Sequence, residues 1–322
     1  MNILITGATG FIGSALVNSF VTHPSFSISV AVRSDSVQFS SAVRCFLVGD
    51  LDADSDWSAP LQGMDVVIHT AARVHIQSDN RADSLTEFRR INVAGTLNLA
   101  RQAKAAGVKR FIYLSSIKVN GEVTEPGSPF LSEQQPAPVD PYAVSKYEAE
   151  TGLLQLVPEV GFDVVIIRPP LVYGPGVKAN FESMLRWLSR GIPLPLGGID
   201  NQRSLLALDN LIDLITICVD HPAAKNQIFL AADGKDLSTT ELLQQLANAL
   251  GRPIRLFPLP FKILEIGAIL LGKRTLTQRL CGSLQVDISK AQELLGWIPP
   301  LSVDQGLIKT ARWYKDELLH SS

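Results

Sequence analysis

Short, almost wholly apolar runs recur through the first half of the chain, and segments with helical periodicity follow them. Runs of this kind, rich in β-branched residues, are typical of strands that a parallel sheet buries on both faces. The pattern predicts strands at Ile3–Thr6, Ile28–Val32, Val43–Val48, Val66–His69, Phe111–Leu114 and Val164–Ile167. It predicts helices between them at Phe11–Phe20, Leu85–Ala106 and Pro141–Leu156. This alternation predicts an α/β fold built on a doubly wound parallel sheet.

The pattern changes after about residue 170. Proline and glycine cluster at 168–176 and at 191–198, which marks loops and ends the regular alternation. Helices are then predicted at Phe181–Arg190, Asp209–Val219, Thr239–Leu250 and Ser302–Glu317. We therefore expect two domains, residues 1–170 and a smaller, mostly helical substrate domain at 171–322. Within 205–231, the runs Leu205–Leu208 and Gln227–Ala231 are candidates to rejoin the main sheet.

Composition and charge exclude several classes of protein. Of the 322 residues, 46% are hydrophobic and 19% charged, which is enough for a complete core. The net charge of −2, without a basic stripe, argues against a nucleic-acid partner. Three scattered cysteines indicate reduced thiols in a cytoplasmic protein, with no metal site, and the amino terminus does not resemble a signal peptide. The apolar stretch Phe261–Leu271 is too short to span a bilayer of about 30 Å, so a packed helix is expected there, with a lid or a contact surface as alternatives.

The first predicted strand runs directly into a glycine-rich turn that opens the first predicted helix. Such glycines allow a tight turn and let the backbone approach a pyrophosphate, which the first N–H groups of the helix then bind. The spacing is G-x-x-G-x-x-G rather than the G-x-G-x-x-G of many dehydrogenases. Its position between a strand and a helix nevertheless predicts a dinucleotide site. The residues expected to contact the dinucleotide here are Gly7, Thr9, Gly10, Phe11, Ile12 and Gly13.

Arg33 directly follows the second predicted strand. An acidic residue near this place would accept a hydrogen bond from the ribose 2′-hydroxyl of NAD. The guanidinium of Arg33 instead suits a 2′-phosphate, and we therefore favour NADP(H) over NAD(H). The alternative is a solvated Arg33, with Asp35 in the acidic role.

Further dinucleotide contacts are expected where the third and fourth predicted strands end. Asp50 and Leu51 follow the third strand, and the Asp50 carboxylate can accept a hydrogen bond from the adenine amino group, unless it only stabilises a turn. Ala71 and Ala72 follow the fourth strand and are small enough to admit the cofactor against the backbone. His69 is expected to pack rather than to act as a base.

The segment from Asp140 to Lys146 resembles a helix start that carries a phenol and an amine. Asp140 can cap the helix, Pro141 suits its first turn, and Tyr142 and Lys146 then share one face. A free phenol titrates near 10, and a neighbouring cation lowers its pKa. To act as a base at neutral pH, Tyr142 needs a pKa about three pH units below that of a free phenol, which corresponds to roughly 4 kcal/mol of phenolate stabilisation. Lys146 and an oxidised nicotinamide can supply it together, and Lys146 can also hold the nicotinamide ribose.

The fifth predicted strand ends in Leu114-Ser115-Ser116, at the sheet edge where ligands of such folds bind. Ser116 is expected to hydrogen-bond the substrate oxygen that Tyr142 protonates, with Ser115 as the alternative and a strand-end cap as the simpler role of either. A Tyr–Lys pair alone is common on ordinary helices. Together with the glycine turn, the pair and Ser116 predict a dinucleotide-dependent oxidoreductase.

Taken together, the glycine turn, Ser116 and Tyr142-x-x-x-Lys146 resemble the extended short-chain dehydrogenase/reductase superfamily, in its nucleotide-sugar epimerase/dehydratase/reductase branch. The likeness covers nearly the whole chain. It also rests on Asn92 in Ile91–Thr96, on the R-P-P-L-V-Y-G-P-G segment at 168–176, and on 287–299. It implies a Rossmann sheet, with Asn92, Ser115 and Pro169 among the cofactor contacts.

The resemblance also implies a substrate. The C-terminal half of such enzymes binds a nucleoside-diphosphate sugar, here expected to be UDP-linked. Asn180, Arg203 and Arg279 stand where these enzymes contact the diphosphate or uracil, with Arg274 as an alternative to Arg279. The guanidinium fork suits a diphosphate. A homodimer is expected, paired through the helices at 85–106 and 141–156.

Departures from the family narrow the reaction. Its dehydratases carry Asp-Glu after the active-site Ser/Thr, where Ile117-Lys118 stands here, and the glutamate of its decarboxylases is also missing. Redox chemistry at C4 of the sugar remains. Arg33 favours a reductase that acts on a UDP-4-keto-(6-deoxy) N-acetylhexosamine in O-antigen or lipopolysaccharide synthesis. The alternative is a 4-epimerase of the UDP-glucose or UDP-N-acetylglucosamine type with tightly bound NAD. A non-catalytic dinucleotide sensor is a third hypothesis, which the retained catalytic side chains disfavour.

Overall fold

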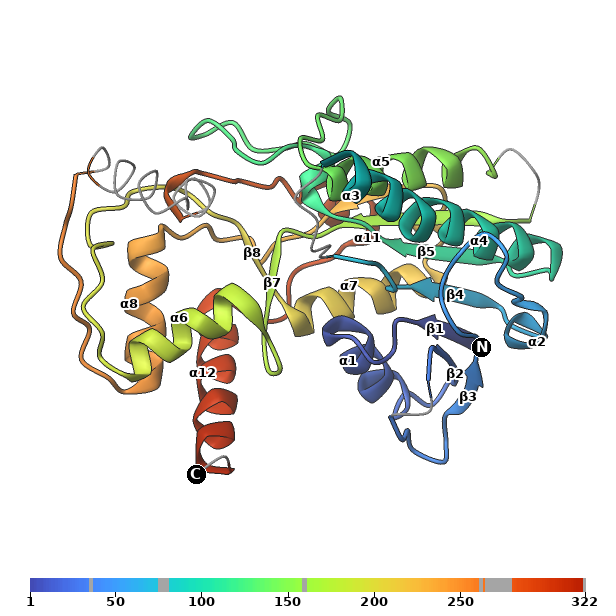
Figure 1. The fold of residues 1–322 in the computed structure, drawn as a ribbon, viewed down its shortest axis with the longest axis horizontal. Coiled ribbons are helices and arrows are strands. Elements are labelled where there is room, and N and C mark those ends of the chain that lie inside the picture. Colours follow the sequence, from blue (N-terminus) through green and yellow to red (C-terminus); the bar gives the residue numbers. More distant parts are fainter. Residues whose placement is uncertain (35–36, 75–80, 158–160, 261–262, 264–279, 321–322) are drawn as a thin grey trace.

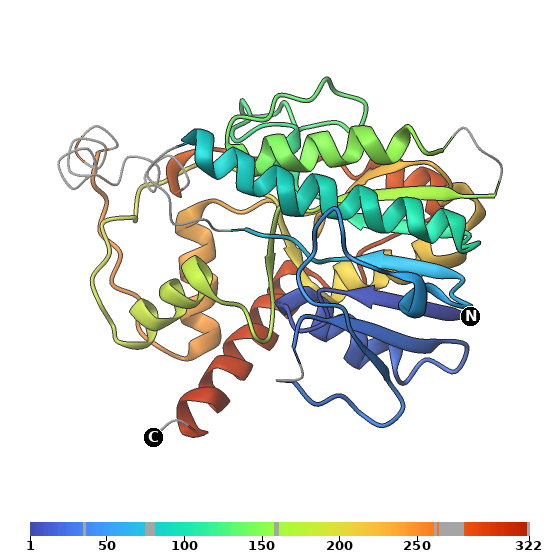
Figure 2. The same cartoon turned by 45° about the vertical axis from the view of Figure 1, so that its right-hand side comes forward.

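The computed structural model of the protein describes residues 1–34, 37–74, 81–157, 161–260, 263 and 280–320 (Figure 1). Helices cover both faces of a central sheet, and a smaller helical lobe lies beyond the carboxyl ends of its strands (Figures 1 and 2). The strands of the main sheet are β1 Asn2–Thr6, β2 Ser27–Val32, β3 Arg44–Leu47, β4 Val66–His69, β5 Arg110–Leu114, β6 Asp163–Arg168 and β9 Ile228–Leu230. The helices around it are α1 Phe11–Phe20, α2 Ser58–Leu61, α3 Arg81–Phe88, η1 Arg89–Gly95, α4 Thr96–Ala105, η2 Ile117–Val119, α5 Pro141–Leu154, α7 Leu208–Asp220, η3 Pro222–Ala224 and α11 Ser289–Leu295.

The seven strands are all parallel and follow the order β3-β2-β1-β4-β5-β6-β9. The chain builds outward from β1 to β3 on one side and then returns to place β4 on the other side of β1. Ligands of open α/β sheets bind at the carboxyl ends of the strands, where the strand order reverses in this way. The strand order therefore predicts a binding crevice at the carboxyl ends of β1 and β4, and it agrees with the predicted doubly wound sheet.

Alternate residues along the strands enter two separate cores. Ile3 and Ile5 face a core made with α1 and α7, whereas Leu4 between them faces a core made with α4 and α5. Successive side chains of a strand point to opposite faces, so a sheet covered on both faces needs apolar residues at every position. This explains the continuous apolar runs of the sequence.

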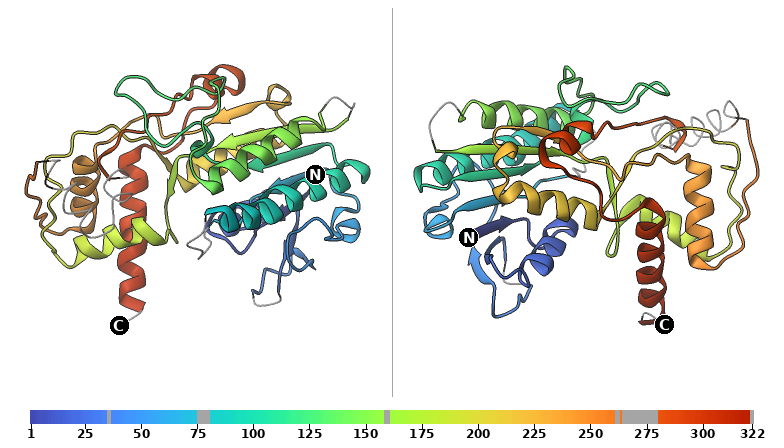
Figure 3. Two further views of the ribbon diagram at one scale, coloured as in Figure 1. Left: turned by 45° about the horizontal axis from the view of Figure 1, so that its top comes forward. Right: turned by 180° about the vertical axis from the view of Figure 1, so that it is seen from behind.

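The C-terminal lobe contains a two-stranded sheet, β7 Leu171–Tyr173 with β8 Leu205–Ala207, and the helices α6 Ala179–Ser189, α8 Thr239–Leu250 and α12 Val303–His320 (Figure 3). The expectation that Leu205–Leu208 rejoins the main sheet is wrong, because this segment pairs with β7. Pro169 and Pro170 end β6, since proline cannot donate to the ladder, and the chain then turns away into β7. The second expectation is confirmed: β9 within Gln227–Ala231 joins β6.

Two predicted helices differ in detail from those observed. The helix expected at Leu85–Ala106 is divided into α3, the π-helical η1 and α4. A π turn often marks a functional site, and it carries Asn92 here. None of the helices in the described part of the chain is long and apolar enough to cross a membrane. The apolar stretch Phe261–Leu271 lies, except for Ile263, outside the described residues.

Candidate active site

The glycine turn between β1 and α1 is shaped to receive a pyrophosphate. Gly7 has a φ of +73°, and a Cβ there would lie 2.6 Å from the Ala71 nitrogen. A Cβ on Gly13 would lie 2.1 Å from the carbonyl oxygen of Gly7. Within the described part of the chain, no side chain caps α1 at Gly10. The first N–H groups of α1 are thus open to an anion at the positive end of the helix dipole, and a dinucleotide fits this turn.

The ends of β2 and β3 place Arg33 beside Asp50. The Arg33 Nη1 lies 4.0 Å from the Asp50 Oδ1, and the two side chains are 79% and 73% exposed. Such an exposed pair contributes little to stability, so Arg33 can turn to a phosphate. Leu51 is half-buried, in contact with Gly95. Asp35, the alternative acidic residue, lies outside the described residues.

The chain leaving β4 packs closely against the glycine turn and is held by Asn92. Ala71 and Ala72 are half-buried there. Asn92 is 1% exposed: its Oδ1 accepts from the Arg73 amide at 2.8 Å, and its Nδ2 donates to the Arg73 carbonyl at 3.0 Å and to the Ser145 hydroxyl at 3.1 Å. Asn92 therefore positions the exit of β4 against α5, and its direct contact with a cofactor stays a prediction.

The expected packing role of His69 is confirmed. Its side chain is fully buried, and its two ring nitrogens lie 2.6 Å from the Thr6 hydroxyl and 2.9 Å from the Thr96 hydroxyl. Burial, together with the charge of Lys146, lowers the pKa of His69 to about 3. The ring is therefore neutral and structural at physiological pH.

Helix α5 presents Tyr142 and Lys146 as the spacing predicted. The Asp140 carboxylate accepts from the Ala143 amide at 2.7 Å and caps the helix, with Pro141 in its first turn. Lys146 is 2% exposed and donates to the Leu114 carbonyl at 2.8 Å. Its Nζ lies 5.9 Å from the centroid of the Tyr142 ring. The phenol and the amine thus stand on one face, at the carboxyl end of β5.

Burial acts against the charged forms of both side chains. Burial lowers the pKa of Lys146 to about 7, against the opposing charge of Glu150. Burial, and after it the charge of Asp140, raises the pKa of Tyr142 above its ordinary 10.0. The lowering that we expected from Lys146 is therefore not found: burial dominates the pKa of Tyr142, and the charge of Asp140 raises it further.

The two serines after β5 point to different partners. Ser115 is buried, and its hydroxyl donates to the Glu150 carboxylate. Ser116 is half-buried, and its oxygen accepts from the Lys118 amide at 3.3 Å. The hydroxyl proton of Ser116 remains available to a substrate oxygen. This arrangement favours Ser116 over Ser115 as the residue that contacts substrate.

A buried ion pair beneath the site was not predicted. Glu150 and Arg168 are each 2% exposed, and the Arg168 Nε lies 3.0 and 3.2 Å from the two carboxylate oxygens. Arg168 also donates to the Asn120 side chain at 2.9 Å. Next to it, the Pro169 carbonyl accepts from the Ile117 amide at 2.9 Å. The position of Glu150, four residues after Lys146 on the same helix face, could have indicated that its carboxylate lies near the site, but not that it pairs with Arg168.

The candidate substrate residues lie in the C-terminal lobe. Asn180 is exposed in the first turn of α6. Arg203 is half-buried; its backbone pairs with Leu237, and its Nη1 donates to the Gly282 carbonyl at 2.9 Å. Arg279, like Arg274, lies outside the described residues, so its expected contact stays a prediction.

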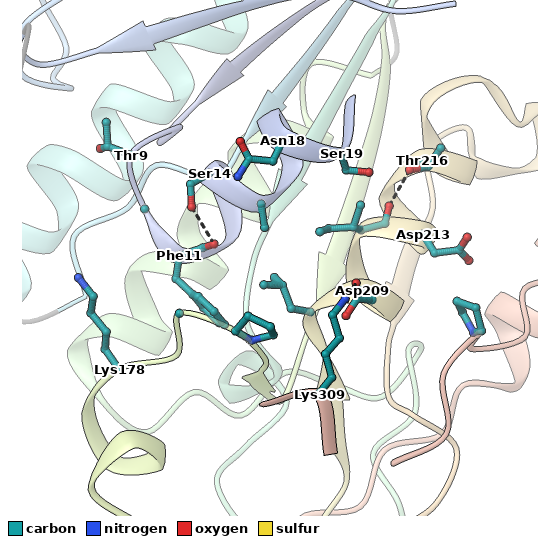
Figure 4. Close-up of a pocket in the computed structure, with 17 residues that line it drawn as sticks. Thr9, Phe11, Ser14, Asn18, Ser19, Lys178, Asp209, Asp213, Thr216 and Lys309 are labelled. Atoms are coloured by element: carbon teal, nitrogen blue, oxygen red, sulfur yellow. Dashed lines mark hydrogen bonds and ion pairs between the residues drawn. The ribbon is translucent and has the colours of Figure 1, made fainter. Parts of the chain in front are cut away.

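A cavity of about 750 Å³ opens between α1 and α7 (Figure 4). Thr9, Gly10 and Phe11 of the glycine turn line one end, and Lys178 and Lys309 approach from the C-terminal lobe. Its size suits a small-molecule ligand. Because the catalytic candidates of α5 do not line it, it represents a continuation of the glycine turn rather than the centre of the chemistry.

Comparison with known proteins shows which family has these features. Residues 3–232 match the NAD dependent epimerase/dehydratase family. The chain belongs to that family. The matched range runs from β1 through β9, and therefore includes the glycine turn, Ser116 and the Tyr142–Lys146 pair. The resemblance to extended short-chain dehydrogenases/reductases is thus confirmed.

Individual relatives of this family share the whole length of the chain. A UDP-glucose 4-epimerase of Vibrio cholerae is 49% identical over 97% of this chain and 94% of its own. The UDP-glucuronic acid 4-epimerase of Bacillus cereus, solved with NAD, superimposes with a TM-score of 0.78 at 22% identity, over 98% of this chain and 99% of its own. RMD of Pseudomonas aeruginosa, solved with NADPH, gives a TM-score of 0.75 at 24% identity with the same coverage. At these identities the two solved structures establish the fold alone, and they confirm its Rossmann character.

Proposed function

We propose that this epimerase/dehydratase-family protein is a 4-epimerase of a UDP-linked hexose. The observation that carries the proposal is the placement of Tyr142, Lys146 and Ser116 at the carboxyl end of β5, on the same edge of the sheet as the glycine turn that follows β1. The 49% identity to a UDP-glucose 4-epimerase supports C4 as the reacting carbon. For the same reason we prefer the epimerase to the reductase that Arg33 alone suggested.

In the proposed reaction, Tyr142 takes the proton of the C4 hydroxyl as the hydride leaves that carbon, and returns a proton when the hydride comes back to the opposite face. A dinucleotide held by the glycine turn would supply the hydride acceptor and, when oxidised, a positive charge that favours the phenolate. Ser116 donates its free proton to the same sugar oxygen and holds it against Tyr142. Lys146, whose ammonium donates to the Leu114 carbonyl, would hold the nicotinamide ribose.

The remaining site residues have roles in the same proposal. The N–H groups of the 7–13 turn, with Thr9, Phe11 and Ile12, would bind the pyrophosphate; Asp50, Leu51, Ala71, Ala72 and Pro169 would line the rest of the dinucleotide site. Asn180 and Arg203 would contact the sugar nucleotide from the 171–322 lobe. A homodimer paired through α4 and α5 belongs to the same proposal.

A 4-ketoreductase is the second candidate, and Arg33 favours it. Its guanidinium is 79% exposed at the end of β2, where it can bind the 2′-phosphate of NADPH. A reductant consumed in each turnover is commonly NADPH, whereas an epimerase returns its hydride. The substrate would then be a UDP-4-keto-(6-deoxy) N-acetylhexosamine of surface-polysaccharide synthesis.

One experiment separates the two candidates. Purified protein is denatured, the released nucleotide is identified, and the protein is assayed with UDP-glucose, UDP-galactose and their N-acetylated forms. Stoichiometric NAD⁺ with interconversion of a C4 pair is the expected result. An empty protein that oxidises NADPH only with a 4-keto sugar nucleotide would establish the reductase instead. The Tyr142→Phe variant should bind dinucleotide and lose turnover, and full activity in that variant would refute the mechanism.

A further inference from the structure

Lys118 joins the two elements that carry Ser116 and Tyr142. It lies in η2, the turn that follows Ser116, and its backbone amide donates to the Ser116 hydroxyl oxygen at 3.3 Å. Its ammonium donates to the Asp140 carboxylate and, at 3.3 Å, to Glu122. Asp140 caps α5 two residues before Tyr142 and six residues before Lys146. A single residue thus bridges the catalytic turn and the start of the catalytic helix.

The backbone amide of Lys118 orients the Ser116 hydroxyl. The Ser116 oxygen uses one lone pair to accept from the Lys118 amide, which fixes its rotamer as a helix cap does. Because the oxygen is then an acceptor toward η2, its own proton is directed elsewhere. Sideways movement of η2 would turn that proton away from α5. The ion pair with Asp140 restrains this movement.

The ammonium group of Lys118 acts on Tyr142 through its ion pair with Asp140. The Asp140 carboxylate opposes formation of a phenolate and, after burial, is the second cause of the raised pKa of Tyr142. Among the described residues, the charged and titratable groups near the phenol are Lys146 from α5, Asp140 from the cap and Tyr113 from β5. Lys118 pairs with Asp140, and Glu122 pairs with Lys118. Lys118 offsets the negative charge of Asp140, and its removal takes that positive charge away from the cap of α5.

We propose that Lys118 is a positioning residue of the active site: it braces the Ser116 turn against the cap of α5 and balances the carboxylate charge beside Tyr142. It does not touch the reacting atoms. The inference rests on the proposed function only in taking Tyr142 as the proton-transferring group.

The test measures ionisation of Tyr142 directly, so that it does not depend on the sugar. Phenolate absorbance is titrated in NAD⁺-loaded protein, and the titration of the Tyr142→Phe variant is subtracted. Lys118→Met should raise the midpoint by roughly one pH unit, and Lys118→Arg should restore most of it. Asp140→Asn keeps the cap and should lower the midpoint by a similar amount. The double variant should titrate close to wild type, because the two charge changes cancel.

Lys290→Met is the matched control. Lys290 is also a half-buried lysine, 23% exposed against 27% for Lys118, and it pairs with Glu133 at 2.8 Å. It should leave the Tyr142 midpoint unchanged. In turnover, Lys118→Met should lower kcat about tenfold at neutral pH and recover at alkaline pH, with KM changed less than about twofold.

The outcomes separate this inference from the proposed function. If no sugar nucleotide is turned over but the midpoints move with opposite signs, the function fails and the role of Lys118 stands. If Lys118→Met and Asp140→Asn leave the midpoint of Tyr142 where it was, the role of Lys118 is refuted. A uniform loss of activity at every pH, together with a lower melting temperature and no rescue by arginine, would also overturn it, because that result describes a merely structural residue.

Discussion

Replacement of Glu150 by glutamine changes the shape of the side chain very little, but it should destabilise the protein strongly. Glu150 and Arg168 are 2% exposed, and Arg168 donates three hydrogen bonds to the carboxylate. Ser115 donates a fourth. An amide of the same shape keeps one acceptor but turns an NH₂ group toward these donors, and it leaves the guanidinium buried without its counter-ion. Removing one partner of a buried pair costs about 3–5 kcal/mol of unfolding free energy.

The same helix provides a matched control. Two residues earlier, Glu148 pairs with Arg89 through both carboxylate oxygens, at 3.1, 2.9 and 2.5 Å, but the two side chains are 31% and 52% exposed. Solvent screens this pair and replaces its hydrogen bonds when it is broken. Glu148→Gln should therefore cost about 0–1 kcal/mol. Burial is the main difference between the two substitutions, so the comparison isolates it.

Urea unfolding followed by circular dichroism, at one fixed dinucleotide concentration, measures both losses, since bound ligand itself shifts stability. We expect Glu150→Gln to exceed Glu148→Gln by at least about 2 kcal/mol. Added salt should reduce the effect of Glu148→Gln and leave that of Glu150→Gln almost unchanged. Replacing both buried partners, as in Glu150→Leu with Arg168→Met, should recover much of the loss. Equal costs for the two single substitutions would show that burial does not govern these pairs.

Two further predictions concern the glycine turn and the buried amine. Gly13→Ala places a Cβ 2.1 Å from the Gly7 carbonyl, so dinucleotide affinity measured by calorimetry should fall more than about tenfold, with a stability loss of about 1–3 kcal/mol. Lys146 has its pKa lowered from 10.5 to about 7 by burial. The unfolded chain therefore binds more protons between these values, and native stability should rise as pH increases from about 7 to 10.5 by up to a few kcal/mol. Lys146→Met should lack this rise, so the difference in stability between wild type and the variant should increase across the same pH range.

Each of these predictions has an internal comparison. Gly10→Ala brings its Cβ only to 3.2 Å from the same carbonyl, so its effect should be clearly smaller than that of Gly13→Ala. If the two alanines behave alike, close approach of the backbone is not what the glycine provides. For Lys146, a difference curve between wild type and Lys146→Met that is flat across the window would mean that the amine keeps its ordinary pKa when folded.

The sequence predicted the main sheet because a local pattern encodes it. Strands buried on both faces carry continuous apolar runs, and the six predicted ones agree with β1 to β6 within one or two residues. Register and partner choice are not local. Leu205–Ala207 is apolar enough for the main sheet, yet it pairs with β7, because the prolines after β6 direct the chain out of that sheet. The π turn at Arg89–Gly95 is also invisible to a period of 3.6, since it depends on the tertiary contacts of Asn92.

The candidate site was predictable where spacing along one element encodes it, and not where separate elements meet. Tyr142 and Lys146 share a helix, and Ser116 ends a strand, so their positions follow from local structure. Glu150 meets Arg168, and Lys118 meets Asp140, only after two elements pack together. Such pairs leave no mark beyond the presence of opposite charges, which are common on any helix. The second layer of the site therefore required the structure.

The electrostatics of the site explain why these second-layer charges matter. Burial opposes both a phenolate at Tyr142 and an ammonium at Lys146, so the phenol stays protonated while the pKa of the amine falls to about 7. Any ligand whose positive charge favours the phenolate must then release a proton on binding, and by linkage its affinity rises with pH. Small changes in nearby charge, such as the balance between Lys118 and Asp140, shift the pH at which this happens. The pH dependence of the rate is therefore set by charged residues that surround the reacting groups without touching them, as Lys118 and Asp140 do.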